Sequence, residues 1–123
     1  MSEQQRVSVI VNNYNYAAYV GKAIESACEQ TYPLTEVIVV DDGSTDNSSE
    51  IISAFGDRIT PIFQPNGGQA AAFNTGLEAS HGEIVIFLDA DDYLFPNAVE
   101  RVVQVWKPGI SKIHYLLKGI DGD

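Results

Sequence analysis

Two short acidic segments are the clearest places where this chain could do chemistry. The first is Asp89-Ala90-Asp91-Asp92, with three carboxylates in four residues at the end of an apolar run. Carboxylates this close repel one another unless a cation or hydrogen bonds offset the repulsion. Hard oxygen ligands of this kind suit Mg²⁺ or Mn²⁺, which keep positions for water and substrate phosphates. The same residues could instead cap the following helix, so the segment alone indicates only a candidate metal site.

The second acidic segment is Asp41-Asp42-Gly43-Ser44-Thr45-Asp46, which also follows an apolar run. A carboxylate here could accept a hydrogen bond from a nucleobase N–H or a ribose hydroxyl, and Gly43 permits a sharp turn with positive φ. A turn followed by a helix cap accounts for the same residue types. Upstream, Asn12-Asn13-Tyr14-Asn15-Tyr16 offers amides and aromatic rings that could contact a base, or could form a tight turn.

Alternating apolar runs and helical patterns indicate which elements position these segments. We predict strands at the runs rich in β-branched residues, and helices where apolar residues recur every three or four positions. The predicted strands are Arg6–Val11, Glu36–Val40, Ile59–Phe63, Ile84–Leu88 and Lys112–Leu117. The predicted helices carry Tyr19–Cys28, Ile51–Phe55, Gln69–Ser80 and Val99–Trp106, the last with Pro96 in its first turn. Pro61 indicates that the third strand lies at an edge of the sheet.

This succession predicts an α/β fold with a mostly parallel sheet of about five strands flanked by helices. In such sheets a ligand lies beyond the carboxyl ends of the strands, near the point where the strand order reverses. Both acidic segments and Asn12 follow predicted strands, so we expect them to meet at that edge. The Asn66–Gln69 loop could add backbone N–H groups ahead of a helix.

The charge of the chain excludes one class of partner. Seventeen acidic and seven basic residues give a formal net charge of −10 at pH 7, with no basic stripe, which argues against nucleic-acid binding. An acidic protein that handles phosphates needs a cation to offset its own charge, although acidity can also simply aid solubility. The apolar runs are too short to cross a bilayer, and neither a signal peptide nor a disulfide is expected with Cys28 as the single cysteine. We therefore expect a cytoplasmic protein.

Four sequence blocks stand in an order and spacing that are more specific than any one of them. They are Val7-Ser-Val-Ile-Val-Asn-Asn-Tyr-Asn15, Val39-Val-Asp-Asp-Gly-Ser-Thr-Asp46, Asn74-x-Gly76 before His81-Gly-Glu83, and Phe87-Leu-Asp-Ala-Asp-Asp92. Together they resemble the inverting family-2 glycosyltransferases, which transfer a sugar from a nucleotide-diphospho-sugar and have a GT-A fold, related to the Rossmann fold. The resemblance runs from about Val7 to about Asn97, and more faintly to Leu117.

The resemblance implies a role for each candidate site residue. Asp42 should contact the base of a nucleotide-sugar, most often the uracil of UDP, and Asn12 should lie against the nucleoside. Asp89 should reach the ribose. Asp91 should hold the divalent metal, Mn²⁺ or Mg²⁺, that bridges the two phosphates, with Asp92 as the next ligand. Such a metal stabilises the charge of the leaving nucleoside diphosphate.

Two departures from the family pattern limit what the resemblance implies. The family often has an arginine just before Asn74, where this chain has Phe73, so no phosphate contact is carried over to that position. The family's catalytic base is a carboxylate from the second half of the domain, and no acid after Asp92 supplies an equivalent. We therefore expect residues 1–123 to form a single donor-nucleotide-binding domain, truncated before the acceptor-binding half. The acceptor is unknown, whether saccharide, lipid or protein.

Other classes of protein share some of these features. A receiver-like signalling domain also has a parallel α/β fold and an acidic magnesium pocket. It needs acids after the first strand and an aspartate after the third, where this chain has Asn12-Asn13 and Phe63-Gln64-Pro65. A nucleotidyltransferase would carry a glycine-rich, basic loop after the first strand. A non-catalytic nucleotide-binding protein stays open, and an exposed sheet edge near Leu117 would promote self-association.

Overall fold

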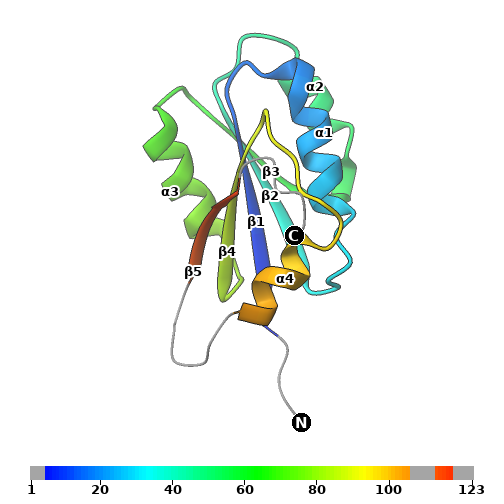
Figure 1. The fold of residues 1–123 in the computed structure, drawn as a ribbon. Helices are drawn as coiled ribbons and strands as arrows, with labels where there is room; N and C mark the ends of the chain where they lie inside the picture. Colours follow the sequence, from blue (N-terminus) through cyan, green and yellow to red (C-terminus); the bar gives the residue numbers. More distant parts are fainter. Residues whose placement is uncertain (1–4, 106–112, 118–123) are drawn as a thin grey trace.

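Five parallel strands form one sheet in a computed structural model that describes residues 5–105 and the backbone of residues 113–117 (Figure 1). The strands are β1 (Val7–Asn13), β2 (Thr35–Asp42), β3 (Thr60–Gln64), β4 (Ile84–Asp89) and β5 (Ile113–Leu117). The helices are α1 (Ala17–Cys28), α2 (Ser48–Ser53), α3 (Gln69–Ala79) and α4 (Ala98–Val105), with a short 3₁₀ turn at Gly56–Arg58. The predicted parallel α/β fold is confirmed.

The strand order is β3-β2-β1-β4-β5, and every neighbouring pair is parallel. The order reverses between β1 and β4, so the ligand crevice expected in an open α/β sheet lies where these two strands end. The register pairs Asn12 with Asp89 at that point. Receiver domains have the order 2-1-3-4-5 instead. The observed order therefore argues against the receiver-like alternative.

Helices cover both faces of the sheet. On one face the strands pack against α1, α2 and α4 in a cluster that includes Val9, Ile24, Ile52, Ile86 and Val99. On the other face α3 packs over Ile10, Ile38, Val40, Val85 and Phe87. Figure 1 shows this division, with α3 on one side of the strands and α1 and α2 on the other. Burial on both faces explains why the central strands are continuous apolar runs in the sequence.

The start of α4 differs from the sequence prediction. α4 begins at Ala98, so the prediction that Pro96 lies in its first turn is wrong, and Pro96 lies in the turn before the helix. Asp46 serves two helices, because Oδ1 accepts the N–H of Ser48 (2.9 Å) and Oδ2 accepts the N–H of Ala17 (3.0 Å). The predicted helix end at Trp106 and strand start at Lys112 lie outside the described residues. In the described part of the chain, no helix combines the length and apolarity that a membrane crossing requires.

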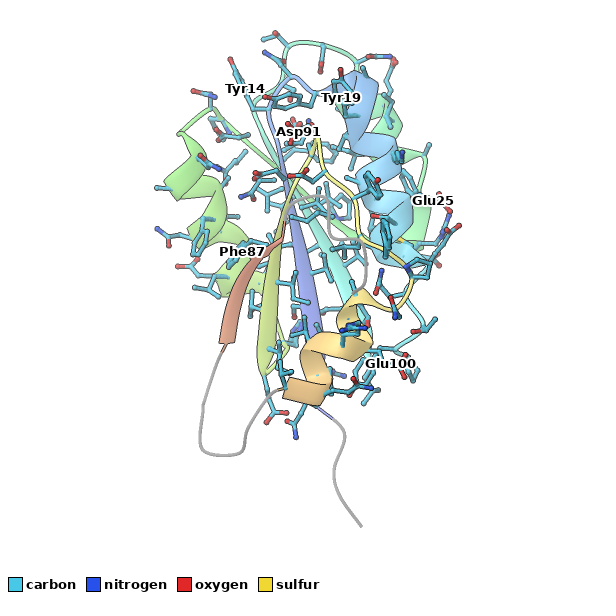
Figure 2. All side chains as sticks on the ribbon, viewed as in Figure 1. Tyr14, Tyr19, Glu25, Phe87, Asp91 and Glu100 are labelled. Carbon is cyan, nitrogen blue, oxygen red and sulfur yellow. The ribbon has the colours of Figure 1, made fainter. Side chains whose placement is uncertain are left out.

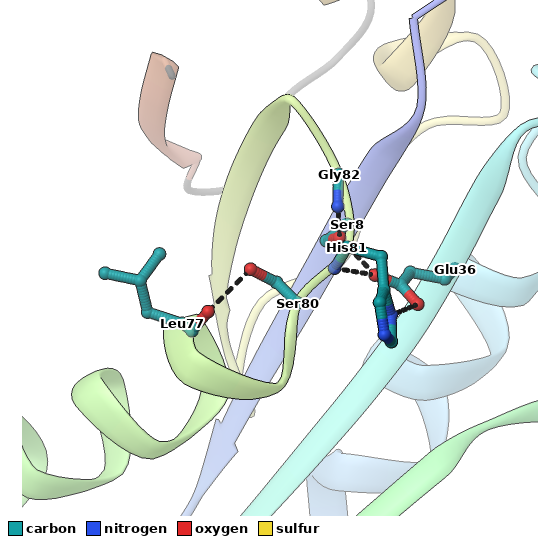
Figure 3. A network of polar contacts seen from close by, with 6 residues as sticks. All are labelled: Ser8, Glu36, Leu77, Ser80, His81 and Gly82. Carbon is teal, nitrogen blue, oxygen red and sulfur yellow. Dashed lines mark hydrogen bonds and ion pairs between the residues drawn. The ribbon is translucent and has the colours of Figure 1, made fainter. Parts of the chain in front are cut away.

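At the amino ends of the strands, the Glu36 carboxylate joins three segments (Figure 3). Oε2 accepts the Ser8 hydroxyl (2.5 Å) and the backbone N–H of His81 (2.6 Å), and Oε1 lies 3.2 Å from Nδ1 of His81. Ser8 Oγ in turn accepts the N–H of Gly82 (2.8 Å). Burial acts to raise the pKa of Glu36, but hydrogen bonds from Ser8 and His81 outweigh it and hold the pKa below its usual value. The network fastens the turn before β4 to β1 and β2.

We predict that Glu36→Gln lowers the free energy of unfolding at pH 7 by about 1–2 kcal/mol, because a neutral amide replaces a charged acceptor. Since the pKa of Glu36 is lowered in the folded state, its stabilisation is complete above the unfolded value of about 4.3 and is lost as the pH falls through the folded value. The stability difference between wild type and variant, measured by urea unfolding, should therefore shrink between pH 7 and pH 3. Glu50→Gln, at an exposed position of α2, is the control. A difference that does not change with pH would contradict the prediction.

Candidate functional site

The carboxyl ends of β1, β2 and β4 bring three predicted site residues to the same face of the sheet. Asn12, Asp42 and Asp89 each lie two positions beyond a side chain in the cluster under α3, namely Ile10, Val40 and Phe87. Since strand side chains alternate between faces, all three point to the α3 side. They line one cavity of about 600 Å³, together with residues of the loops after β1, before α3 and after β4.

The adjacent residues Asn13 and Asp41 point to the opposite face and tie the ends of β1 and β2 together. Nδ2 of Asn13 donates to Oδ1 of Asp41 (2.8 Å) and to Oγ of Ser44 (3.1 Å). The Ser44 hydroxyl donates to the same oxygen of Asp41 (2.7 Å) and accepts the N–H of Asn15 (2.8 Å). Both Asn13 and Asp41 are buried. This network fixes the spacing between the strand ends that carry the cavity residues.

Asp42 is a buried residue, 4% exposed, and its carboxylate holds the loop that precedes α3. Oδ1 accepts Nε2 of Gln64 and the N–H of Gly67, both at 2.9 Å. Oδ2 accepts the N–H of Gly68 (2.9 Å) and Nδ2 of Asn66 (3.2 Å). Burial acts to raise the pKa of Asp42, but the hydrogen bonds outweigh it and the pKa lies below its usual value. Four donors fill the roughly four acceptor positions of a carboxylate, so a ligand N–H that bonds to Asp42 must replace one of them.

The turn after Asp42 requires glycine. Gly43 has a φ of +76°, and a Cβ at this position would lie 2.6 Å from the backbone nitrogen of Asn66. The positive φ predicted for Gly43 is confirmed. The close approach of the two backbones is what lets Asp42 reach the N–H groups of the loop.

Asp89, Asp91 and Asp92 form a cluster just beyond β4. One carboxylate oxygen of each lies within 4.8 Å of the others, and Asp91 is the exposed member and lines the cavity. The loop is shaped by backbone hydrogen bonds from Ala90 to Asn12 (3.1 Å) and from Asp92 to Asp89 (3.0 Å). Figure 2 shows Asp91 at the same end of the sheet as Tyr14 and Tyr19. Three carboxylate oxygens are a donor set that fits Mg²⁺ or Mn²⁺.

The segment after this cluster is held by polar side chains of α1 and of the residues just after it, which the sequence alone did not identify. Nε2 of Gln30 donates to the carbonyl of Phe95 (2.8 Å), and Oε1 accepts the N–H of Val99 in α4 (2.8 Å). Oγ of Ser26 accepts the N–H of Leu94 (3.0 Å). A loop with backbone groups fixed to a helix holds its side chains in a narrower range of positions. No pattern in the sequence identifies these partners, which lie more than 60 positions apart.

The described residues that line the cavity include three aspartates and no lysine, arginine or histidine. Phe73 carries no charge, and its ring stacks on Phe87 of β4, with centroids 3.7 Å apart and an interplanar angle of 13°. An anionic ligand in this cavity would therefore face acidic groups, with no basic side chain from the described part of the lining. A bound cation would offset that repulsion.

This chain belongs to glycosyl transferase family 2, because the family model matches residues 8–110. The membership confirms the resemblance carried by the four sequence blocks. It also places the cavity and the acidic cluster in a family of sugar-transferring proteins.

Relatives and solved structures agree with this assignment. An uncharacterized glycosyltransferase of Nostoc sp. (strain PCC 7120) is 46% identical over 117 residues, which are 90% of this chain and 36% of the relative. Staphylococcus aureus TarS 1-349 in complex with UDP-GlcNAc superposes with a TM-score of 0.72 at 31% identity, over 80% of this chain and 30% of that one. The mannosyltransferase PcManGT from Pyrobaculum calidifontis, in complex with GDP-Man and Mn²⁺, gives 0.71 at 30% identity, over 87% and 34%. The chain spans about a third of the length of each of these proteins.

We predict that Gly43→Ala lowers the free energy of unfolding by more than about 3 kcal/mol, because it adds a clash with the Asn66 backbone to the strain of a left-handed residue. Gly56→Ala is a matched control, since Gly56 has a φ of +62° but open space where a Cβ would lie. It should cost only about 1–2 kcal/mol, the conformational strain alone. Urea unfolding of both variants gives the comparison. Equal losses of stability in the two variants would mean that the close approach of Gly43 to Asn66 does not constrain this turn.

Proposed function

We propose that this chain binds the nucleotide-diphospho-sugar donor of a glycosyltransferase, with a divalent metal held by the acidic cluster. The observation that carries the proposal is the composition of one cavity. Asn12, Asp42 and Asp89 line it beside Asp91. Among the described lining residues, no basic side chain offsets the charge of the aspartates. A cavity of this kind suits a ligand that offers hydrogen-bond donors at one end and a metal-bound diphosphate at the other.

Three residues are proposed to bind the nucleoside. Oδ1 of Asn12 is buried and has no hydrogen-bond partner among the described residues, which supports a role as acceptor for a ligand N–H or O–H. Asp42 is proposed to accept the N–H of the base, most often uracil, in place of one of its four present donors. Asp89, beside Asn12 in the register, is proposed to accept the ribose hydroxyls. The exposed ring of Tyr14 at the cavity offers a stacking surface for the base.

Asp91 and Asp92 are the proposed metal ligands, with Asp89 close enough to assist. Mn²⁺ and UDP are the first choices for testing, because the similar structures bind UDP-GlcNAc in one case and GDP-Man with Mn²⁺ in the other. When bound, a divalent cation supplies Lewis-acid stabilisation of the departing nucleoside diphosphate. The protein's own carboxylates orient that diphosphate by fixing where the cation sits.

The proposed reaction is transfer with inversion. The oxygen of an acceptor hydroxyl forms a bond to the anomeric carbon, the bond from that carbon to the diphosphate breaks, and a base takes the hydroxyl proton. No described residue is assigned as that base, so the proposed part of this chain is donor binding. The acceptor, a saccharide, lipid or protein, and a cytoplasmic location remain part of the proposal.

We predict that UDP binds this chain at least tenfold more tightly with Mn²⁺ than without it, because the described residues of the cavity lining offer no basic side chain to neutralise the diphosphate. Asp91→Asn should lose most of that metal-dependent gain. Asp57→Asn, at an exposed position in the 3₁₀ turn, is the matched control and should keep it. Calorimetric titration of UDP gives the affinities. An affinity for UDP that is the same with and without Mn²⁺, and the same in wild type and Asp91→Asn, would contradict the proposed function.

A further inference from the structure

We propose that Thr75 and Gln64 are positioning residues that hold Oδ1 of Asp42 in place, so that Oδ2 is the oxygen that accepts a hydrogen bond from a bound nucleotide. The inference rests on the proposed function and assigns a role to two residues outside the cavity lining. It follows from a chain of hydrogen bonds that runs from α3 through the end of β3 to the end of β2.

The chain of hydrogen bonds begins at Thr75 on α3. Its hydroxyl lies 2.6 Å from Oε1 of Gln64, and Nε2 of Gln64 donates to Oδ1 of Asp42 over 2.9 Å. A hydroxyl that donates to Oε1 fixes which end of the amide faces which partner. The NH₂ group of Gln64 is thereby turned toward the carboxylate, where an amide oxygen would be repelled. The carbonyl of Ala71, one turn back on α3, lies 2.9 Å from Thr75 Oγ1 and competes for the same single proton, and we assign the hydrogen bond to Gln64 because that contact is the shorter one.

The two oxygens of Asp42 differ in how firmly their donors are held. Oδ1 is bonded to Gln64, which Thr75 orients, and to the backbone N–H of Gly67. On Oδ2, the bond from Nδ2 of Asn66 is the longest of the four at 3.2 Å. The same nitrogen lies 3.0 Å from the backbone carbonyl of Asp42, so Asn66 stays attached if it leaves Oδ2. Asn66 is therefore the donor that a ligand can replace at least cost.

The cavity lies on the side of Asp42 where this exchange would occur. Asn66 and Gly68, the two donors to Oδ2, both line the cavity. The two donors to Oδ1, Gln64 and Gly67, are not among its lining residues. A nucleotide entering the cavity therefore meets Oδ2 first. Thr75 and Gln64 hold the other oxygen, Oδ1, and so keep the carboxylate from rotating when Asn66 is displaced.

The test compares Thr75→Val, which keeps the shape and removes the hydroxyl, with Thr75→Ser, which keeps the hydroxyl. Calorimetric titration of UDP into the full chain with Mn²⁺ should show affinity about tenfold weaker for Thr75→Val, the effect of one hydrogen bond, and close to wild type for Thr75→Ser. Gln64→Leu should weaken binding at least as much. The double variant Thr75→Val/Gln64→Leu should be no weaker than Gln64→Leu, because both residues act through one bond to Asp42.

A second measurement needs no variant. In nuclear magnetic resonance spectra of the wild-type chain with Mg²⁺, added UDP should shift the side-chain amide signals of Asn66 much more than those of Gln64. Larger shifts at Gln64, unchanged affinity in Thr75→Val, or a Thr75→Ser as weak as Thr75→Val would each overturn this inference and leave donor binding intact. A wild-type chain that fails to bind UDP with either metal would overturn the proposed function, and this inference with it.

Discussion

The site depends on one buried, ionised carboxylate at the end of β2. Asp42 is 4% exposed, and an isolated charge at such a position would be strongly disfavoured. Four N–H donors from the end of β3 and from the loop before α3 make the charge tolerable, and they also determine where that loop lies. Gly43 is required because the two backbones must approach closely for these bonds to form. This loop leads into α3, which packs over apolar side chains of the sheet and supplies Ala72 to one wall of the cavity.

The alternation of strand side chains lets each strand end serve two purposes. In the pairs Asn12-Asn13 and Asp41-Asp42, one residue points to the cavity face and the other to the face of α1. Asn13 and Asp41 bond to each other and hold the ends of β1 and β2 in register. Their neighbours Asn12 and Asp42 point to the cavity, where Asp42 also holds the loop before α3. A one-residue slip in either strand would exchange these roles and destroy the site.

Much of this arrangement could be predicted from the sequence, since it depends on local patterns. The apolar runs gave the strands, Pro61 placed β3 at an edge, and the acidic segments after β2 and β4 gave the candidate residues that the structure brings together. The strand order could not be predicted, because local pattern does not say which strands are neighbours. Gln64, Thr75 and Gln30 were missed for a related reason: an isolated polar residue gains meaning only from a partner that tertiary structure supplies. Pro96 was placed in a helix by its general preference, whereas the chain there is held in a turn before α4.

We propose that a nucleoside diphosphate and its metal occupy the cavity between the strand ends and α3. A crystal structure of the chain with UDP and Mn²⁺, in which anomalous scattering locates the manganese, would show where both ligands bind. We expect manganese bound to Asp91, the ribose near Asp89, and the uracil between Asn12 and Asp42. Manganese bound away from the Asp89–Asp92 loop, or a nucleotide seated on the α1 face of the sheet, would contradict it.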